Sequence, residues 1–204
     1  MRYKIIDQKG LNFITLTIVD WIDLFTRRWF CELVLESLDY SRKEKGLLIF
    51  AYVIMPSHLH LIVRAGKEKK LSTILKEFKS FTARQILDNL NKTSFKESRK
   101  EWLLRHFKAA ADRHSTNGIH KVWQDSNHPI ELYTPKVIRQ KLMYIHRNPV
   151  AAGIVDAPEH YLFSSASNYQ KKHLPEQQKK CKLEIDLLEG IWNDEGYVFM
   201  GRTD

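Results

Sequence analysis

The order of hydrophobic patterns predicts an α+β fold, a ferredoxin-like sandwich in which an antiparallel sheet carries helices on one face. Residues 13–19 alternate as a strand does, and residues 47–64 form two strand-like runs joined at a Pro-Ser turn. A helical pattern follows each of these strand segments. We expect one domain at residues 1–170 and a C-terminal extension, residues 171–204, that is not an independent domain.

Side-chain periodicity predicts the elements of the first half. Residues 13–19 alternate apolar side chains with threonine, which is typical of a half-buried strand. Residues 26–40 place apolar side chains at helical spacing, and Gly46 ends that segment. Residues 47–55 are almost continuously apolar and predict a central strand, with residues 58–64 as its hairpin partner.

The second half is predicted to be mainly helical. Residues 71–87 repeat apolar side chains at helical spacing, and residues 101–112 form a further helical segment. Residues 123–132 predict a short strand with an irregular middle. Thr134, as N-cap before a proline, predicts a last helix that runs to about Arg147 and is stopped by the proline that follows.

Composition favours a polyanionic partner. The 204 residues include 33 Lys and Arg against 24 Asp and Glu, a formal net charge of +9. Basic side chains release counterions from a phosphate backbone, which strengthens binding to nucleic acid. Many proteins are basic without a specific reason, so charge alone gives nucleic acid only a slight advantage.

The chain carries no pattern that indicates a membrane or an oxidising compartment. No segment approaches the roughly 18 apolar residues that span a bilayer, and the first residues lack the pattern of a secretory signal. Cys31 and Cys181 are too few and too far apart for a disulfide framework or a zinc knuckle. We expect a cytoplasmic, soluble and reduced protein with no membrane partner. A short tail at residues 185–192 is expected to pack on the body.

His58 and His60 are the sharpest local feature. Side chains two apart in a strand point to the same face, so both imidazoles project together while Leu59 faces the other way. Two neutral imidazoles form part of a ligand set for a divalent metal. The alternative is a surface strand that happens to carry two histidines, and the spacing alone favours that alternative.

Tyr144 and Asn148 form the second feature. Four residues apart in a helix, the phenol and the carboxamide share one face. That face differs from the apolar stripe of Ile138, Leu142 and Ile145, so Tyr144 is available for chemistry. An interfacial tyrosine with a wet hydroxyl is the simpler interpretation of Tyr144 taken alone.

Together, these segments resemble a known family. Residues 53–63 (VIMPSHLHLIV) resemble the histidine-hydrophobe-histidine motif of the HUH endonucleases, and residues 144–155 (YIHRNPVAAGIV) resemble the tyrosine signature of their single-tyrosine transposase branch. Residues 123–124 and 161–166 are similar to the REP-associated tyrosine transposases in particular. The resemblance covers roughly residues 10 to 170.

The resemblance implies a covalent mechanism on single-stranded or hairpin DNA. Tyr144 would attack a phosphodiester and leave a 5′-phosphotyrosine. A phenol is a poor nucleophile until a cation or base favours its phenolate. His58 and His60 would hold Mg²⁺ or Mn²⁺ with an oxygen of Asn148, and the ion would polarise the phosphate. Ala151 stands where the family pattern usually has arginine, which weakens the case for one phosphate contact.

Four basic side chains are candidate contacts to the DNA backbone. Lys141, one turn before Tyr144, is the best of them. The other three share one predicted helix, whose basic face is as well explained by simple solvation: Lys76, Lys79 and Arg84.

Three questions stay open from the sequence. Relatives in the insertion-sequence branch act as dimers, whereas the REP-associated branch acts within one chain, so a homodimer and a single-chain site are both open. A non-catalytic nucleic-acid-binding protein on the same fold competes with the enzyme. A zinc metallohydrolase, in which the histidines bind zinc and activate water, is a further alternative to the covalent mechanism.

Overall fold

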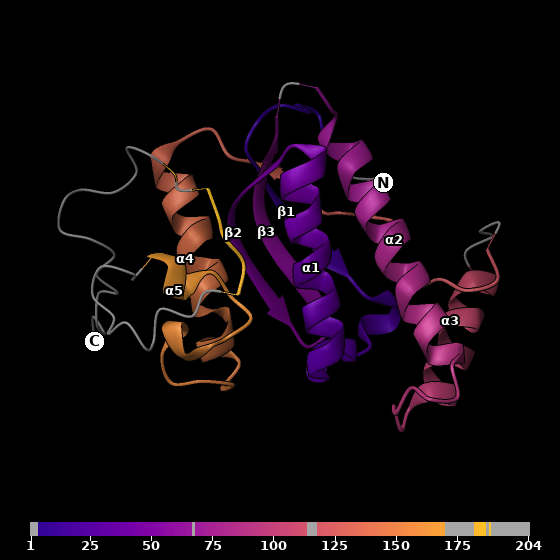
Figure 1. Ribbon diagram of the computed structural model, residues 1–204. Helices are drawn as coiled ribbons and strands as arrows, with labels where there is room; N and C mark the ends of the chain where they lie inside the picture. The colour runs from indigo at the N-terminus through magenta and orange to yellow at the C-terminus, as the bar shows by residue number, and fades with distance from the viewer. Residues whose placement is uncertain (1–3, 67, 114–117, 170–181, 187, 189–204) are drawn as a thin grey trace.

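An antiparallel sheet with helices on both faces forms the described part of the computed structural model (Figure 1). The structure describes residues 4–66, 68–113, 118–169, 182–186 and 188. Within these residues the sheet has the order β2-β3-β1-β4. Its strands are β1 (Asn12–Thr17), β2 (Leu47–Met55), β3 (His58–Ala65) and β4 (Ile130–Glu131).

The strand register places the start of β3 in the middle of the sheet. Met55 pairs with His58 across the hairpin, and Thr17 pairs with His58 from the other side. His60 lies between Val53 of β2 and Thr15 of β1 in the same way. Both predicted strands of the hairpin are confirmed, as is the predicted first strand.

One face of the sheet is covered by α1 (Arg28–Lys45) and α2 (Leu71–Asn91), and α3 (Lys100–Arg113) packs beside α2 (Figure 1). Alternate side chains of the strands point into this layer and form the larger apolar core, among them Leu59, Leu61 and Val63. Gly46 ends α1 with a left-handed φ of 69°, a conformation that glycine adopts at little cost.

The opposite face is covered by α4 (Pro135–Ala151) (Figure 1). Leu142 and Ile145 pack there against a smaller apolar cluster that includes Phe13 and Ile62. The expectation that helices cover one face alone is therefore wrong for α4. Burial drives this arrangement, because the apolar stripe of α4 would otherwise be left in water.

The ends of α4 confirm one prediction and correct another. The side chain of Thr134 accepts a hydrogen bond from the Val137 amide and caps the helix, as predicted. The predicted end at Arg147 is wrong, because the helix continues through Pro149 to Ala151. Pro149 lacks one backbone N–H, but it is buried and keeps helical geometry, and Gly153 follows the helix with a φ of 68°.

Short elements complete the described structure: η1 (Val19–Trp21), η2 (Leu24–Thr26), η3 (Pro158–His160) and α5 (Ala166–Tyr169). The predicted irregular strand at residues 123–132 is represented by β4 and by an isolated bridge of Trp123 to Ile18. Among the residues described, no helix is long and apolar enough to cross a membrane.

Part of the C-terminal extension lies against β2. The backbone amide of Asp186 donates to the carbonyl of Ile49, and the Asp186 carboxylate accepts from the Ile49 amide. Leu183 and Ile185 are buried in the larger core. Cys181 and most of the tail predicted to pack on the body lie outside the described residues.

Candidate active site

His58 and His60 lie side by side on the sheet face that α4 covers. Their ring centroids are 4.7 Å apart. Leu59 points into the larger core on the other face, so the alternation predicted for this strand is confirmed. The pair therefore presents two imidazoles to one small region at the start of β3.

Each imidazole is oriented through its Nδ1 atom. Thr15 Oγ1 lies 2.9 Å from His60 Nδ1, and Ser57 Oγ lies 3.2 Å from His58 Nδ1. The Nε2 atom of His60 is buried and has no hydrogen-bond partner within the described residues. A buried polar atom without a partner is costly, so this nitrogen is left available for a ligand.

Both histidines are held neutral. Burial lowers the pKa of His58. Burial, with the charges of His58 and Lys141, lowers the pKa of His60 to about 3. At pH 7 both rings therefore keep a lone pair, which is the form that coordinates a metal ion.

Tyr144 of α4 lies next to this pair within the same chain. Its ring centroid is 5.3 Å from that of His60 and 6.0 Å from that of Phe13. The Nζ atom of Lys141 lies 5.5 Å from the Tyr144 ring centroid and 4.8 Å from that of Phe13. Tyr144 is 49% exposed, so its ring borders the histidines while much of its surface faces solvent.

Asn148 shares a shallow hollow with Tyr144. This hollow has a volume of about 370 Å³ and is lined by Gln140, Met143, Tyr144, Arg147, Asn148 and Ala151. Within the described residues no hydrogen bond joins the Asn148 side chain to either histidine. The structure thus brings Tyr144 against His60, which in turn contacts His58, and it places Asn148 on the tyrosine's side of the site.

The donor set suits a metal held by two imidazoles and completed from elsewhere. No group of three or more His, Cys, Asp or Glu side chains gathers in the described residues. The unpartnered Nε2 of His60 and the neutral His58 supply two nitrogen donors. An amide oxygen and phosphate oxygens are the kinds of group that complete such a set for Mg²⁺ or Mn²⁺.

The four basic candidates are divided by the sheet. Lys141 lies at the site, whereas Lys76, Lys79 and Arg84 belong to α2 on the opposite face. Lys76 and Arg84 are exposed there. The Lys79 ammonium donates to the carbonyl of Gln124 at 2.6 Å and to neighbouring acceptors, so it holds the chain beside β1.

His146 lies near Tyr144 in sequence but faces away from the site. It is fully buried, its Nε2 lies 2.8 Å from Ser165 Oγ, and its ring packs on Tyr169. Burial lowers its pKa to about 3. His146 therefore ties α4 to the segment that follows it rather than taking part in the site.

Sequence reasoning missed three residues that border the histidines. Phe13 stacks on His60 at 5.1 Å, Thr15 bonds to it, and Trp21 contacts His58 with its ring centroid 5.4 Å away. Alternation places Thr15 on the face opposite to Ile14. The alternation of residues 13–19 does not give the register of β1 against β3, and it is this register that puts Thr15 opposite His60.

Comparisons with known proteins point to a transposase family. A family profile described as "Transposase IS200 like" matches residues 23–126, just over half of the chain, including both histidines. A solved REP-associated tyrosine transposase bound to a REP hairpin is 18% identical, with a TM-score of 0.56 over 86% of each chain. That similarity concerns the fold.

Two further comparisons add nothing to the assignment. A candidate transposase from Deinococcus radiodurans R1 is 16% identical and covers 71% of this chain and 95% of its own. Its TM-score of 0.38 is too low to bear on the fold. A search of curated proteins found no match.

The family profile ends at residue 126, before α4 begins. It therefore covers β2, β3 and the histidine pair, while the place of Tyr144 rests on the geometry given above. The profile nevertheless spans more than half of the sequence and agrees with the shared fold. The chain therefore belongs to the IS200-like transposases, a family that acts on DNA.

Proposed function

We propose that this transposase is a metal-dependent single-strand DNA endonuclease and strand transferase with Tyr144 as its nucleophile. One observation carries the proposal: the Tyr144 ring lies 5.3 Å from the His60 ring within one chain. The tyrosine comes from a helix that covers the same sheet face to which both histidines project. One chain therefore supplies every residue of the proposed site.

The reaction follows from the chemistry of a phenol beside a phosphodiester. The Tyr144 oxygen gives up its proton and bonds to phosphorus, and the bond from phosphorus to the 3′ oxygen breaks. The 3′ oxygen takes up a proton and leaves as a hydroxyl, so the strand is cut without water. The 5′-phosphotyrosine is itself a phosphate ester, so the energy of the broken bond is conserved. A second 3′-hydroxyl can therefore attack the phosphorus, release Tyr144 and join the strands.

His58, His60 and Asn148 are the residues that would hold Mg²⁺ or Mn²⁺. Such a cation, when bound, polarises the phosphate and offsets its developing charge. The support is the neutral state of both imidazoles and the unpartnered Nε2 of His60. Thr15 and Ser57 orient the rings, and contacts of this kind tune metal ligands.

Lys141 is proposed to contact the DNA backbone at the site. Its ammonium lies over the rings of Phe13 and Tyr144, where a phosphate must approach the nucleophile. Lys76 and Arg84 lie on the far face and would contact only DNA that wraps around the domain. The relative solved with a REP hairpin supports hairpin-forming repeat DNA as the substrate class.

A covalent-adduct assay tests the proposal. Labelled single-stranded hairpin DNA from repeats that flank the gene is incubated with the protein and Mn²⁺ or Mg²⁺, then separated on a denaturing gel. We expect a labelled band that migrates with the protein, disappears with EDTA and disappears in Tyr144→Phe. Tyr133→Phe is the matched control, because Tyr133 is an exposed tyrosine just before α4.

Two other outcomes identify the competing functions. Binding without an adduct, with several repeats and both metals, assigns the protein as a non-catalytic DNA-binding protein. Cleavage that survives Tyr144→Phe assigns the chemistry to water activated by a metal at the histidines.

A further inference from the structure

Trp21 is an exposed tryptophan at the edge of the candidate active site. It ends η1, which directly follows β1, and it is 60% exposed. Its ring meets that of His58 edge-on, at 5.4 Å and 73°. Trp21, His58, His60 and Tyr144 thus form a row of neighbouring rings that begins in solvent and ends at the proposed nucleophile.

The other described tryptophans have different surroundings. Trp123 is buried between Phe25 and Phe78, and Trp29 packs on Phe30 and Phe95. Trp102 is exposed on α3, where it packs on His106 away from the site. Among these four, Trp21 alone borders the histidine pair.

The backbone that presents Trp21 is strained. Asp20 and Trp21 both have positive φ values, 55° and 57°, although neither is glycine. A left-handed conformation is unfavourable for residues with a Cβ, so two in succession persist only where surrounding contacts hold them. Such strain gathers at sites where a side chain must be aimed.

Contacts from three directions hold this segment. The Asp20 carboxylate pairs with Arg113 of α3 at 2.5 Å. The amide of Ile18 donates to the carbonyl of Ser57, next to the first histidine, and the amide of Val19 donates to the carbonyl of Val122. These contacts fix the start of η1 against the hairpin that carries the histidines.

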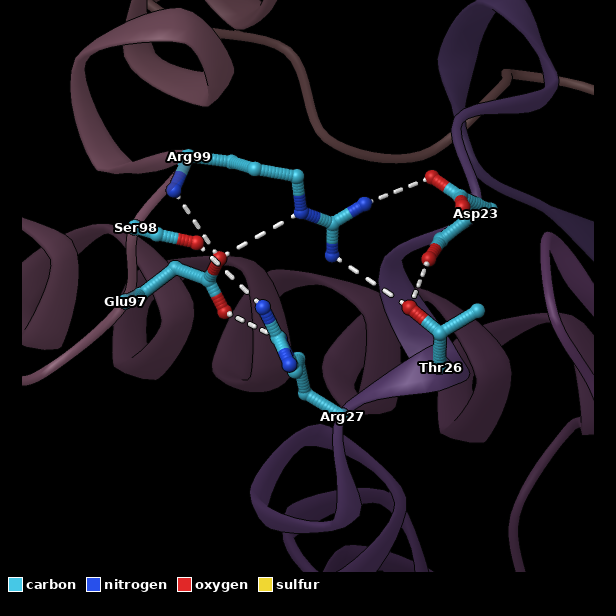
Figure 2. A network of polar contacts seen from close by, with 6 residues as sticks. All are labelled: Asp23, Thr26, Arg27, Glu97, Ser98 and Arg99. Atoms are coloured by element: carbon cyan, nitrogen blue, oxygen red, sulfur yellow. Dashed lines mark hydrogen bonds and ion pairs between the residues drawn. The ribbon is translucent and has the colours of Figure 1, made fainter.

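A polar network fixes the other end of the segment (Figure 2). Arg99 bonds to Asp23 at 2.7 Å and pairs with the buried carboxylate of Glu97 at 3.3 Å, and Glu97 also pairs with Arg27. Residues 20–27 are therefore clamped to α3 and to the loop before it. The exposed indole is fixed in place although little packs on it.

We propose that Trp21 stacks on an unpaired base of the DNA strand beside the bond that is cut. An indole ring has no charge for a phosphate to bind, but its π-face stacks on any base. Trp21 would hold the strand as it passes from solvent to His58. The inference rests on the proposed function and adds a base-binding residue to it.

Binding measurements with abasic DNA test the inference. A Tyr144→Phe background keeps the DNA uncut, and hairpin DNAs are made with a single abasic position placed in turn along the strand near the cut. We expect Trp21→Ala to weaken binding of intact DNA about tenfold. One abasic position should weaken binding by the parent protein by a similar factor and have little effect on Trp21→Ala.

Two controls separate stacking from structure. Trp102→Ala removes an exposed tryptophan that also packs on a histidine, and it should leave both binding and the abasic profile unchanged. Trp21→Phe keeps a ring and should keep most of the affinity and the same sensitive position. If Trp21→Ala unfolds, Trp21→Leu takes its place, because it keeps an apolar side chain without a ring and should lose the sensitivity to the abasic position.

The outcomes distinguish this inference from the function beneath it. If protein with Tyr144 intact forms the adduct, but Trp21→Ala and every abasic position weaken binding independently in the Tyr144→Phe background, the stacking role alone is overturned. Equal loss in Trp21→Ala and Trp102→Ala also overturns it alone. Protein that neither binds nor cuts single-stranded DNA overturns both.

Discussion

The two faces of the sheet differ in how completely they are filled. The face under α1 and α2 is a large apolar core in which Leu59, Leu61 and Val63 are fully buried. The face under α4 carries a smaller apolar cluster and, beside it, two histidines with an unpartnered nitrogen. The same strand, β3, supplies both faces at alternate positions. Stability and chemistry are thus separated by the alternation of a single strand.

Two buried histidines near α4 differ in the same way. His60 and His146 both have a pKa of about 3, and burial is the main cause for each. His146 Nε2 is satisfied by Ser165, whereas His60 Nε2 has no partner in the described residues. The same residue type is a structural tie at one place and a ligand candidate at the other.

The largest expected effect comes from removing a proposed metal-ligand nitrogen from the sheet face under α4. His60→Ala should lower the rate of adduct formation by about a thousandfold or more, a loss of about 4 kcal/mol of transition-state stabilisation. The fold should survive, because the change removes a buried polar atom that lacks a partner. Rates from single-turnover gels test this, with His106→Ala as control. An unfolded His60→Ala protein would contradict the separation of the faces.

A change on the filled face should do the reverse. Leu61→Ala should lower the free energy of unfolding by about 3 kcal/mol, because it opens a cavity in the larger core. Denaturant titration measures this loss. Below its unfolding midpoint the variant should still form the adduct. A folded Leu61→Ala protein without activity would show that the two faces are coupled.

Acid should reveal the tie made by His146. Its folded pKa of about 3 lies below the ordinary value of 6.5, so the unfolded chain binds the proton first and stability falls as pH drops below about 6.5. By pH 5 this histidine should cost about 2 kcal/mol of unfolding free energy. His146→Gln should be less stable at pH 7 and less sensitive to acid. Denaturant titrations at pH 7 and pH 5 give the loss of unfolding free energy on acidification for each protein. An equal loss in the parent and in His146→Gln would contradict this role of His146.

The smallest effect is expected at the clamp in Figure 2. Burial alone would raise the pKa of Glu97, but hydrogen bonds from Arg99 and the charges of Arg99 and Arg27 lower it. Glu97→Gln should therefore lower stability by about 1 kcal/mol, since both arginines are partly exposed. Glu32→Gln, which removes a more solvent-exposed partner of Arg28 and Lys182, should change stability less. Thermal unfolding measures both, and the opposite order would contradict the clamp.

Local patterns were enough to predict most of the fold. Alternation at residues 13–19 and the apolar run at 47–55 are properties of short segments, and they predicted β1 and β2. Which face of the sheet α4 covers depends on tertiary packing, and no local sequence pattern indicates it. Pro149 shows a similar limit, because burial in the core carries the helix through a residue that usually ends one.

Local spacing likewise marks only part of the candidate site. His58 and His60 follow from strand alternation, and Tyr144 and Asn148 from helical spacing. Trp21 could not be found from the sequence, because its role depends on a strained turn held by Arg113, which lies 92 positions further along the chain. Lys79 looked like a DNA contact, yet its ammonium is engaged by the chain beside β1.

The central claim is that one chain supplies both the nucleophile and the histidines. Mixing Tyr144→Phe protein with His60→Ala protein tests it most directly, because each variant keeps the half of the site that the other lacks. We predict that the mixture forms no more adduct than either variant alone, at any protein concentration. Adduct that appears only on mixing would place the tyrosine of one chain at the histidines of another and contradict the single-chain site.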